Sequence, residues 1–112
     1  MILELAILHV RSGESLAFEG AFAQAQSIIS AMPGYIGHQL QRCLESPAKY
    51  VLLVHWQKLE DHTIGFRQSP QYQEWKGLLH HFYDPFPTVE YYEPVCASAA
   101  QPVPTSNRRF SL

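Results

Sequence analysis

Apolar residues fill both alternating sets of positions in the first stretch of the chain. One set comprises Ile2, Ala6, Leu8 and Val10, and the other comprises Leu3, Leu5 and Ile7. Only Glu4 and His9 interrupt them. A strand with one wet face alternates apolar with polar residues, whereas a strand that is apolar on both sides is covered on both sides. The pattern therefore predicts a strand from Ile2 to Val10 with two covered faces.

Apolar residues then recur at every third or fourth position, which is the spacing of one helix face. The members of this repeat are Phe18, Ala21, Phe22, Ala25, Ile28, Ile29 and Met32. Ser12 and Gly13 separate the repeat from the first strand, and Pro33-Gly34 ends it. The sequence predicts one amphipathic helix from about residue 14 to 32.

Two strand-like runs follow, from Tyr35 to Leu44 and from Lys49 to Gln57. The apolar stretch Val51-Leu52-Leu53-Val54 is the expected buried centre of the second run. Only the turn Glu45-Ser46-Pro47-Ala48 separates the two runs. A connection this short indicates an antiparallel hairpin.

The second half of the chain begins with a short helix, expected to start at Leu59. Ser69-Pro70 predicts a new helix, because Ser is a good N-cap and Pro is favoured at the first helical position. Aromatic and leucine side chains then recur at helical spacing until Asp84-Pro85. Residues 88–94 predict a last strand, and the Ala-, Ser-, Pro- and Gln-rich residues 96–112 predict a flexible tail.

The resulting order of elements is β-α-β-β-α-β, which is the ferredoxin-like arrangement of the α+β class. We expect residues 1–95 to form one such domain, with a four-stranded antiparallel sheet and both helices on one face. The strands from 2 to 10 and from 49 to 57 are nevertheless apolar on both sides. The simplest cover for the second face is the same face of a second copy. A homodimer with its two sheets packed into a dimeric α/β barrel is therefore predicted.

Composition narrows the class of protein. The net charge of −2, with 16% charged residues, is unlike the basic surface of a nucleic-acid-binding protein. No apolar run approaches the ~20 residues of a membrane span, and the strand-like N-terminus lacks a basic leader region, so a cytoplasmic protein is expected. Cys43 and Cys96 form no Cys-X-X-Cys pair and are expected to be reduced and far apart within one subunit.

Ring side chains are unusually dense between residues 55 and 83. They are His55, Trp56, His62, Phe66, Tyr72, Trp75, His80, His81, Phe82 and Tyr83. An aromatic pocket with a titratable imidazole suits a flat organic molecule and the transfer of a proton on it. No His-X-His, His-X-X-X-His or His-Glu-X-X-His spacing occurs within one element, so no metal site is predicted.

Several short motifs carry a resemblance to a known family. They are Met32-Pro33-Gly34-Tyr35 before the second strand, Trp56 at the end of the third, Leu59-Glu60-Asp61-His62, and Phe66-Arg67-x-Ser69-Pro70-x-Tyr72. With these, residues 1–95 resemble an antibiotic biosynthesis monooxygenase (ABM) domain of the dimeric α/β-barrel superfamily. That superfamily includes monooxygenases without metal or flavin, haem-degrading enzymes, quinol oxidases and members with no known activity. The resemblance implies the fold, the dimer and a substrate site between sheet and helices.

The chain departs from the best-known sites of that superfamily. The haem-degrading branch uses Asn, Trp and His, and the polyketide-oxidising branch uses Asn with Trp, Tyr and Arg. The single asparagine here is Asn107, in the tail. The tryptophan of the haem branch falls on Phe66, and its haem-ligating histidine falls near Trp75-Lys76. Haem degradation is therefore disfavoured, although His80 and His81 lie one turn further on.

Oxygen insertion without a cofactor needs a base that turns a phenol or enol into an electron-rich anion. His62 is the candidate base, because it lies four residues before Phe66 on one helix face. The predicted pocket residues are Phe66, Tyr72, Trp75, Arg67 and His55, with Arg67 placed to steady an anionic oxygen. The expected partners are a small aromatic molecule and molecular oxygen, with no metal or other cofactor.

The leading hypothesis is thus a cofactor-independent monooxygenase acting on a small aromatic or quinol-like compound. His62 could instead cap or pack its helix, Arg67 could be solvated, and the stripe of Tyr72, Trp75 and Phe82 could be core. In that case the chain would be a non-catalytic ligand-binding or stress-related dimeric module. Haem binding or degradation is a third reading.

Overall fold

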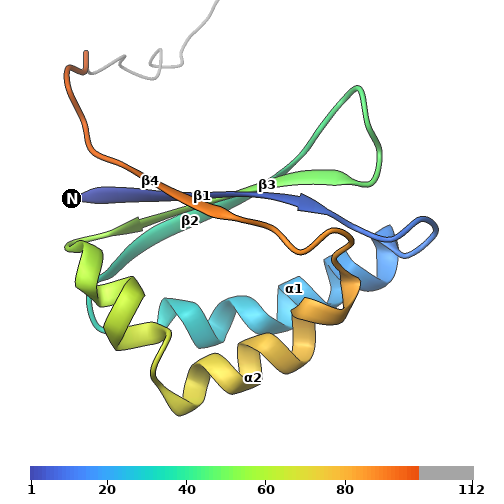
Figure 1. Cartoon of the computed structure of the whole chain (residues 1–112), viewed down its shortest axis with the longest axis horizontal. Helices are drawn as coiled ribbons and strands as arrows, with labels where there is room; N and C mark the ends of the chain where they lie inside the picture. Colours follow the sequence, from blue (N-terminus) through green and yellow to red (C-terminus); the bar gives the residue numbers. More distant parts are fainter. Residues whose placement is uncertain (99–112) are drawn as a thin grey trace, which may run out of the picture.

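The computed structural model describes residues 1–98, and its elements follow the predicted order (Figure 1). The strands are β1 (Ile2–His9), β2 (Tyr35–Arg42), β3 (Lys49–Trp56) and β4 (Val89–Tyr92). The helices are α1 (Ser15–Ser30) and α2 (Pro70–Leu79), with a π-helical turn η1 (Asp61–Phe66) and a 3-10 turn η2 (His80–Phe82). The predicted ferredoxin-like α+β fold is confirmed, and several elements are shorter at their ends than predicted.

The four strands form one antiparallel sheet in the order β2-β3-β1-β4. The hairpin of β2 and β3 and the positions of β2 and β4 at opposite edges are as predicted. The register pairs Glu4 with Val54 on one side and with Tyr91 on the other. Residues paired across antiparallel strands point to the same face, so these three side chains share one face of the sheet.

Both helices lie on one face of the sheet, and none of the described residues 1–98 covers the other, here called the bare face (Figure 1). The core between sheet and helices contains Ala6, Leu8, Leu52, Val54 and Trp56 from the strands and Phe18, Phe22, Ala25, Ile29, Trp75 and Leu79 from the helices. The bare face carries Leu3, Leu5, Ile7, Val51 and Leu53, all only partly buried. The sequence predicts that both faces of β1 are covered, and residues 1–98 cover one of them.

A tight turn at Pro33-Gly34 fixes where η1 begins. Gly34 has φ +85°, and a Cβ there would overlap the carboxylate of Asp61. The same carboxylate accepts the backbone N–H of Lys58 at 3.0 Å. Only a residue without a side chain fits this approach. The contact holds η1 beside the end of β3 and directs His62 toward the sheet.

The start of α2 follows the predicted capping. The Ser69 hydroxyl accepts the backbone N–H of Tyr72 at 3.2 Å, and Pro70 is the first helical residue. Cys43 and Cys96 are both free thiols. Among residues 1–98, no helix is long and apolar enough to cross a membrane. The predicted tail begins at residue 96, and its residues 99–112 lie outside the described part of the chain.

Candidate functional site

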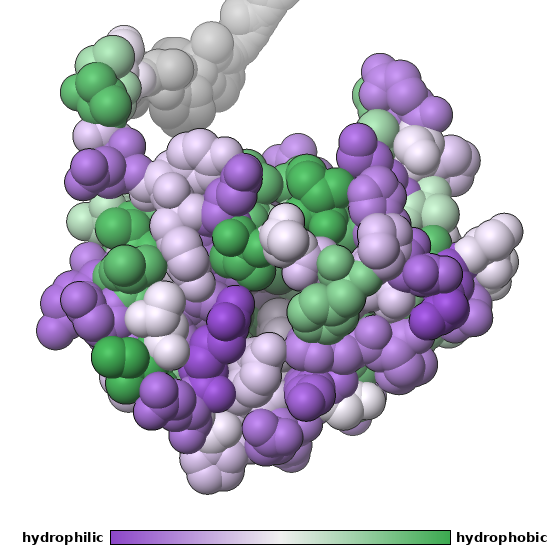
Figure 2. All heavy atoms as spheres, in the orientation of Figure 1, coloured by the Kyte–Doolittle hydropathy of each residue, from purple (hydrophilic) through white to green (hydrophobic). Residues whose placement is uncertain are grey.

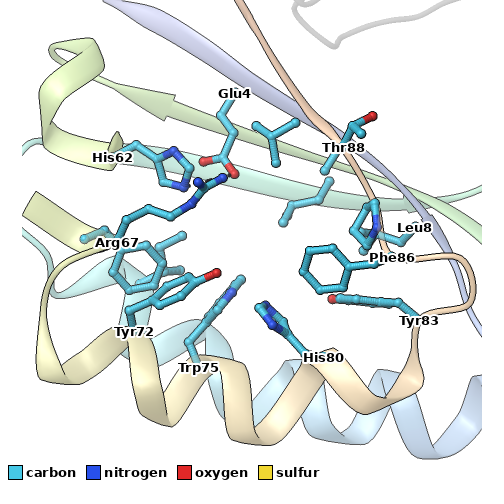
Figure 3. Close-up of a pocket in the computed structure, with 16 residues that line it drawn as sticks. Glu4, Leu8, His62, Arg67, Tyr72, Trp75, His80, Tyr83, Phe86 and Thr88 are labelled. Carbon is cyan, nitrogen blue, oxygen red and sulfur yellow. Dashed lines mark ion pairs between the residues drawn. The ribbon is translucent and has the colours of Figure 1, made fainter. Parts of the chain in front are cut away.

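A cavity of about 430 Å³ lies between the covered face of the sheet and helix α2 (Figure 3). Glu4, Ala6 and Leu8 form its roof on β1, and α2 supplies Tyr72 and Trp75. The segment that leads into β4, with Phe86, Pro87 and Thr88, closes one side. Figure 2 shows apolar side chains gathered near the middle of the face turned to the viewer. The volume falls within the range of small-molecule sites.

Glu4 and His62 form the polar end of the cavity. Glu4 Oε2 lies 3.4 Å from His62 Nε2, and the two side chains are 7% and 4% exposed. The indole N–H of Trp56, which is fully buried, donates to Glu4 Oε1 at 2.9 Å. Arg67 extends toward Glu4 from the end of η1 (Figure 3). A buried acid, an imidazole and a cation therefore share one small volume.

The second ring nitrogen of His62 also has a partner. His62 Nδ1 and the phenol oxygen of Tyr91 are 2.6 Å apart. Tyr91 lies on the edge strand β4 and is partly exposed. A phenol both donates and accepts, so Tyr91 can satisfy either neutral tautomer of the ring. Glu4, His62 and Tyr91 thus form a chain from the cavity to the sheet edge.

Burial shifts the protonation of the acidic and imidazole groups in opposite directions. Burial raises the pKa of Glu4 from 4.5 to about 7, opposed by the Trp56 hydrogen bond and the charge of Arg67. Burial lowers the pKa of His62 from 6.5 to about 4, and the charge of Arg67 lowers it further. Desolvation disfavours the charged form of each group. Near neutral pH the carboxyl titrates while the imidazole stays neutral.

Aromatic rings line the rest of the cavity. Phe66 meets Tyr72 edge to face at 5.3 Å between centroids and meets Trp75 at 5.7 Å. At the far end the ring centroids of His80 and Phe86 are 4.9 Å apart, and Tyr83 lies near them (Figure 3). Burial lowers the pKa of His80 to about 4, with the charges of Lys76 and Arg67 adding to the effect. This neutral, aromatic end suits the body of a flat ligand.

Five of the six residues predicted for the site line this one cavity. They are His62, Phe66, Arg67, Tyr72 and Trp75. The placement of His55 needs correction, because it lies on the bare face, paired with Leu3 across the sheet. Alternation along β3 turns Trp56 to the helices and His55 away from them. Phe82, the third member of the predicted stripe, is buried in the core.

Sequence reasoning missed three residues of the site. Glu4 was noted only as an interruption of an apolar strand, although a lone acid in such a strand is itself a signal of a functional site. Tyr91 carried no comparable signal, since it is an ordinary strand tyrosine. His80 belongs to the ring-dense segment, but a histidine at the end of a helix is also favoured by the helix dipole. Their contribution depends on β4 returning beside β1 and on the turn after α2.

The side chains around the cavity indicate which kind of ligand it can bind. No group of three or more His, Cys, Asp or Glu side chains within residues 1–98 is arranged to hold a metal ion. The cation of Arg67 and the donor–acceptor pair of Glu4 and His62 instead suit the hydroxyl or oxyanion of an organic molecule.

Comparison with known proteins places these observations in a family. The family model described as antibiotic biosynthesis monooxygenase matches residues 1–78. The uncharacterized protein YczJ of Bacillus subtilis (strain 168) is 58% identical over 95 residues, which are 85% of this chain and 100% of that protein.

Solved structures share the fold. A Bordetella bronchiseptica structure assigned to the antibiotic biosynthesis monooxygenases has a TM-score of 0.81 and 34% identity, covering 85% of this chain and 97% of its own. SnoaB of Streptomyces nogalater, a cofactor-independent oxygenase, has a TM-score of 0.69 and 17% identity, covering 89% of this chain and 97% of its own. At that lower identity the likeness concerns the fold alone.

Proposed function

The chain belongs to the antibiotic biosynthesis monooxygenase family, and we propose that it is a cofactor-independent monooxygenase acting on a small aromatic or quinol-like compound. The observation that carries this proposal is the enclosed Glu4–His62 pair at one end of a cavity walled by aromatic rings. A cavity filled by Trp75 and Phe82 would have favoured a non-catalytic module. Instead Trp75 lines an open volume and Phe82 packs elsewhere.

The proposed reaction draws its electrons from the substrate. Removal of the phenol proton gives an anion that passes one electron to molecular oxygen, and the two radicals combine into a C–O bond. The resulting peroxide loses its ring C–H proton as the O–O bond breaks. One oxygen atom stays on the ring as a quinone carbonyl, and the other leaves as water. Phenol and oxygen thus become quinone and water, and no external reductant is needed.

Each part of the cavity has a role in this scheme. The Glu4–His62 pair takes the phenol proton, and Arg67 stabilises the anionic oxygen. Phe66, Tyr72 and Trp75 hold the ring and exclude water, which keeps the radical pair from escaping. The neutral, aromatic far end of the cavity favours a ligand with an uncharged body, whose charge develops beside Arg67 during the reaction.

The second copy predicted from the sequence fits the bare face of the sheet. Leu5 and Leu53 are paired there, as are Ile7 and Val51, so the half-buried apolar side chains form one continuous patch. A patch of this kind is normally an interface. A homodimer joined through this face is part of the proposal, and the cytoplasmic location expected from the sequence stays a prediction.

Oxygen uptake tests the proposal. Purified protein is offered a panel of hydroquinones, naphthols and polycyclic phenols, with the product of ¹⁸O₂ incubation analysed by mass spectrometry. One labelled atom in the product and one in water is the expected result. His62→Gln and Glu4→Gln are expected to lower the rate by about 100-fold or more. The matched controls are His9→Gln and Glu74→Gln, both at exposed positions.

The same assay separates the alternatives. Oxygen consumed with hydrogen peroxide as product, and no label in the organic product, would make the protein an oxidase. Binding of the phenols without oxygen uptake would make it a ligand-binding module. Uptake that the Glu4 and His62 variants retain would remove the pair from the chemistry.

A further inference from the structure

We infer that Glu4 is the residue that accepts the substrate proton, and that His62 is a positioning residue that stays bonded to Glu4 by changing its ring tautomer. This inference rests on the proposed monooxygenase reaction, within which it assigns separate tasks to the two members of the pair. The sequence had favoured His62 as the direct base, and the contacts of the ring argue for a different division.

Both nitrogens of the His62 ring face groups of the protein. Nδ1 lies 2.6 Å from the Tyr91 phenol oxygen, and Nε2 lies 3.4 Å from Glu4 Oε2. The side chain is only 4% exposed. A direct base must reach the substrate hydroxyl at hydrogen-bonding distance through a free nitrogen. Nδ1 of His62 is taken by Tyr91, and Nε2 is nearest to Glu4 Oε2.

Glu4 is placed differently. Trp56 donates to Oε1, which leaves Oε2 to face both His62 and the cavity that Glu4 lines. A carboxylate oxygen accepts two hydrogen bonds, so Oε2 has room for a substrate hydroxyl beside the His62 contact. Arg67 extends to the same place, where the anion would form (Figure 3).

The ring can adapt to both protonation states of Glu4. An ionised Glu4 takes a hydrogen bond from Nε2–H while Tyr91 donates to Nδ1. A protonated Glu4 donates to a bare Nε2 while Nδ1–H donates to the Tyr91 oxygen. In both arrangements the ring is neutral and every polar atom has a partner. The 3.4 Å separation is long for a hydrogen bond, and catalytic contacts are often long before substrate binds.

The groups around Glu4 come from four elements. His62 belongs to η1, Tyr91 to β4 and Tyr72 to α2, while Trp56 on β3 is a donor that does not titrate. Arg67, after η1, is a cation that lowers the pKa of both Glu4 and His62. The pKa of Glu4, raised to about 7, suits a group that must take and return a proton near neutral pH.

Glu4 takes up and returns both protons that the reaction moves. The substrate O–H bond breaks and its proton goes to Oε2, leaving the electron pair on the substrate oxygen. After the C–O bond forms, Glu4 returns that proton to the outer peroxide oxygen and is ionised again. It then takes the ring C–H proton and gives it to the departing hydroxide, which leaves as water. Glu4 begins and ends the cycle ionised.

The first test needs no substrate. In full-length protein labelled with ¹⁵N-histidine, the His62 ring signals are assigned by their loss in His62→Gln. We expect the ring to stay neutral between pH 5 and 9 and to exchange tautomers with a midpoint near the pKa of Glu4, about 7. In Glu4→Gln the exchange should vanish. A fixed tautomer in the native protein, or a second proton on the ring in this range, would overturn the inference.

The second test follows the proton itself under anaerobic conditions. The ground-state ionised fraction of bound 2-naphthol is read from its ultraviolet absorption spectrum, in which naphtholate absorbs at longer wavelength than naphthol. Glu4→Gln should lower this fraction by about tenfold or more, while His62→Gln should keep ionisation but move its pH midpoint. Glu74→Gln is the matched control, and circular dichroism checks that each variant folds. Naphthol that is bound but not ionised by native protein would contradict the inference, as would ionisation that Glu4→Gln retains.

The experiments distinguish failure of the proposed monooxygenase reaction from failure of the proposed role of Glu4. Ionised naphthol in the cavity without any oxygen uptake would refute the monooxygenase and leave Glu4 as a proton acceptor. Oxygen uptake that depends on His62 but not on Glu4 would refute the inference and leave the monooxygenase. The isosteric Gln at position 4 still accepts the Trp56 N–H, so loss of fold is not expected to mimic either result.

Discussion

The two faces of the sheet are built from nearly the same kinds of residue and have different tasks. On the covered face Leu52, Val54 and Trp56 are buried beneath the helices. On the bare face their immediate neighbours Leu53 and His55 are only partly buried. One step along the chain thus moves a side chain from the core and its cavity to a surface that none of the described residues covers. The strongly polar group at the centre of β1, Glu4, lies on the covered side, where burial costs most.

This contrast teaches that burial alone does not mark a site. Both faces carry apolar side chains, but only the covered face sets an acid, an imidazole and a cation side by side in one cavity. The pKa values of Glu4 and His62 there are shifted because the surrounding core is dry. On the bare face, His55 Nδ1 is buried without a partner among the described residues. The contrast can be tested with neighbouring residues that point to opposite faces.

The largest expected effect is the difference between placing a charge at Leu52 and placing it at Leu53. Leu52→Glu places a charge in the core and is expected to abolish folding, with a cost above about 4 kcal/mol. Leu53→Glu places the same charge on the bare face, where we expect a folded monomer in place of a dimer. Circular dichroism and light scattering measure the two outcomes. A Leu53→Glu protein that keeps its native mass would place the dimer contact elsewhere.

The next effect concerns pH and stability. Folded Glu4 keeps its proton up to about pH 7 but releases it near 4.5 when unfolded, so its contribution is full below 4.5 and lost as pH rises through 7. His62 has the opposite effect on stability. Its contribution to the free energy of unfolding is fully present above pH 6.5 and is lost as the pH falls through about 4. Glu4→Gln removes only the first contribution. Relative to native protein it should gain about 3 kcal/mol between pH 4.5 and 8.

Urea unfolding at several pH values measures this difference. Glu74→Gln, which changes an exposed acid on α2, should run parallel to the native protein over the same range. A Glu4→Gln profile that also runs parallel would show that the Glu4 carboxyl titrates near its ordinary pKa.

A smaller effect separates the neighbours Tyr91 and Tyr92. Tyr91→Phe removes the partner of His62 Nδ1 inside the protein and should cost about 1 to 3 kcal/mol. Tyr92→Phe removes a hydroxyl that bonds Glu90 at an exposed edge, and should cost less than about 0.5 kcal/mol. Thermal unfolding monitored by calorimetry compares the pair. Equal losses of stability would mean that the Tyr91 hydrogen bond is as exposed to water as that of Tyr92.

The finest test compares Trp56 with His55 through the pH dependence of activity. Trp56→Phe removes the hydrogen bond that lowers the pKa of Glu4, so the rising limb of the pH–rate profile should move to higher pH. His55→Phe changes the opposite face and should leave the midpoint in place. Oxygen uptake across pH 5 to 9 is the measurement. A shift of equal size in both variants would indicate a change in the sheet rather than in the site.

Much of the site was predictable because its residues lie close together along the chain. His62 and Phe66 lie four residues apart in η1, Arg67 follows directly, and Tyr72 and Trp75 lie three residues apart at the start of α2, so helical spacing groups the members of each helix on one face. The prediction for His55 was wrong because both sets of positions in β3 are apolar. Such a strand has no polar side to show which way each residue points.

The order of the elements, the hairpin, the capped start of α2 and the apolar character of the central strands follow from the sequence, because each depends on contacts between near neighbours. The partnership of Glu4, His62 and Tyr91 does not. It joins β1, η1 and β4, which meet only when the sheet closes in the order β2-β3-β1-β4. The dry surroundings that shift their pKa values are made by the same closure. The protonation of this site is therefore a property of the tertiary structure.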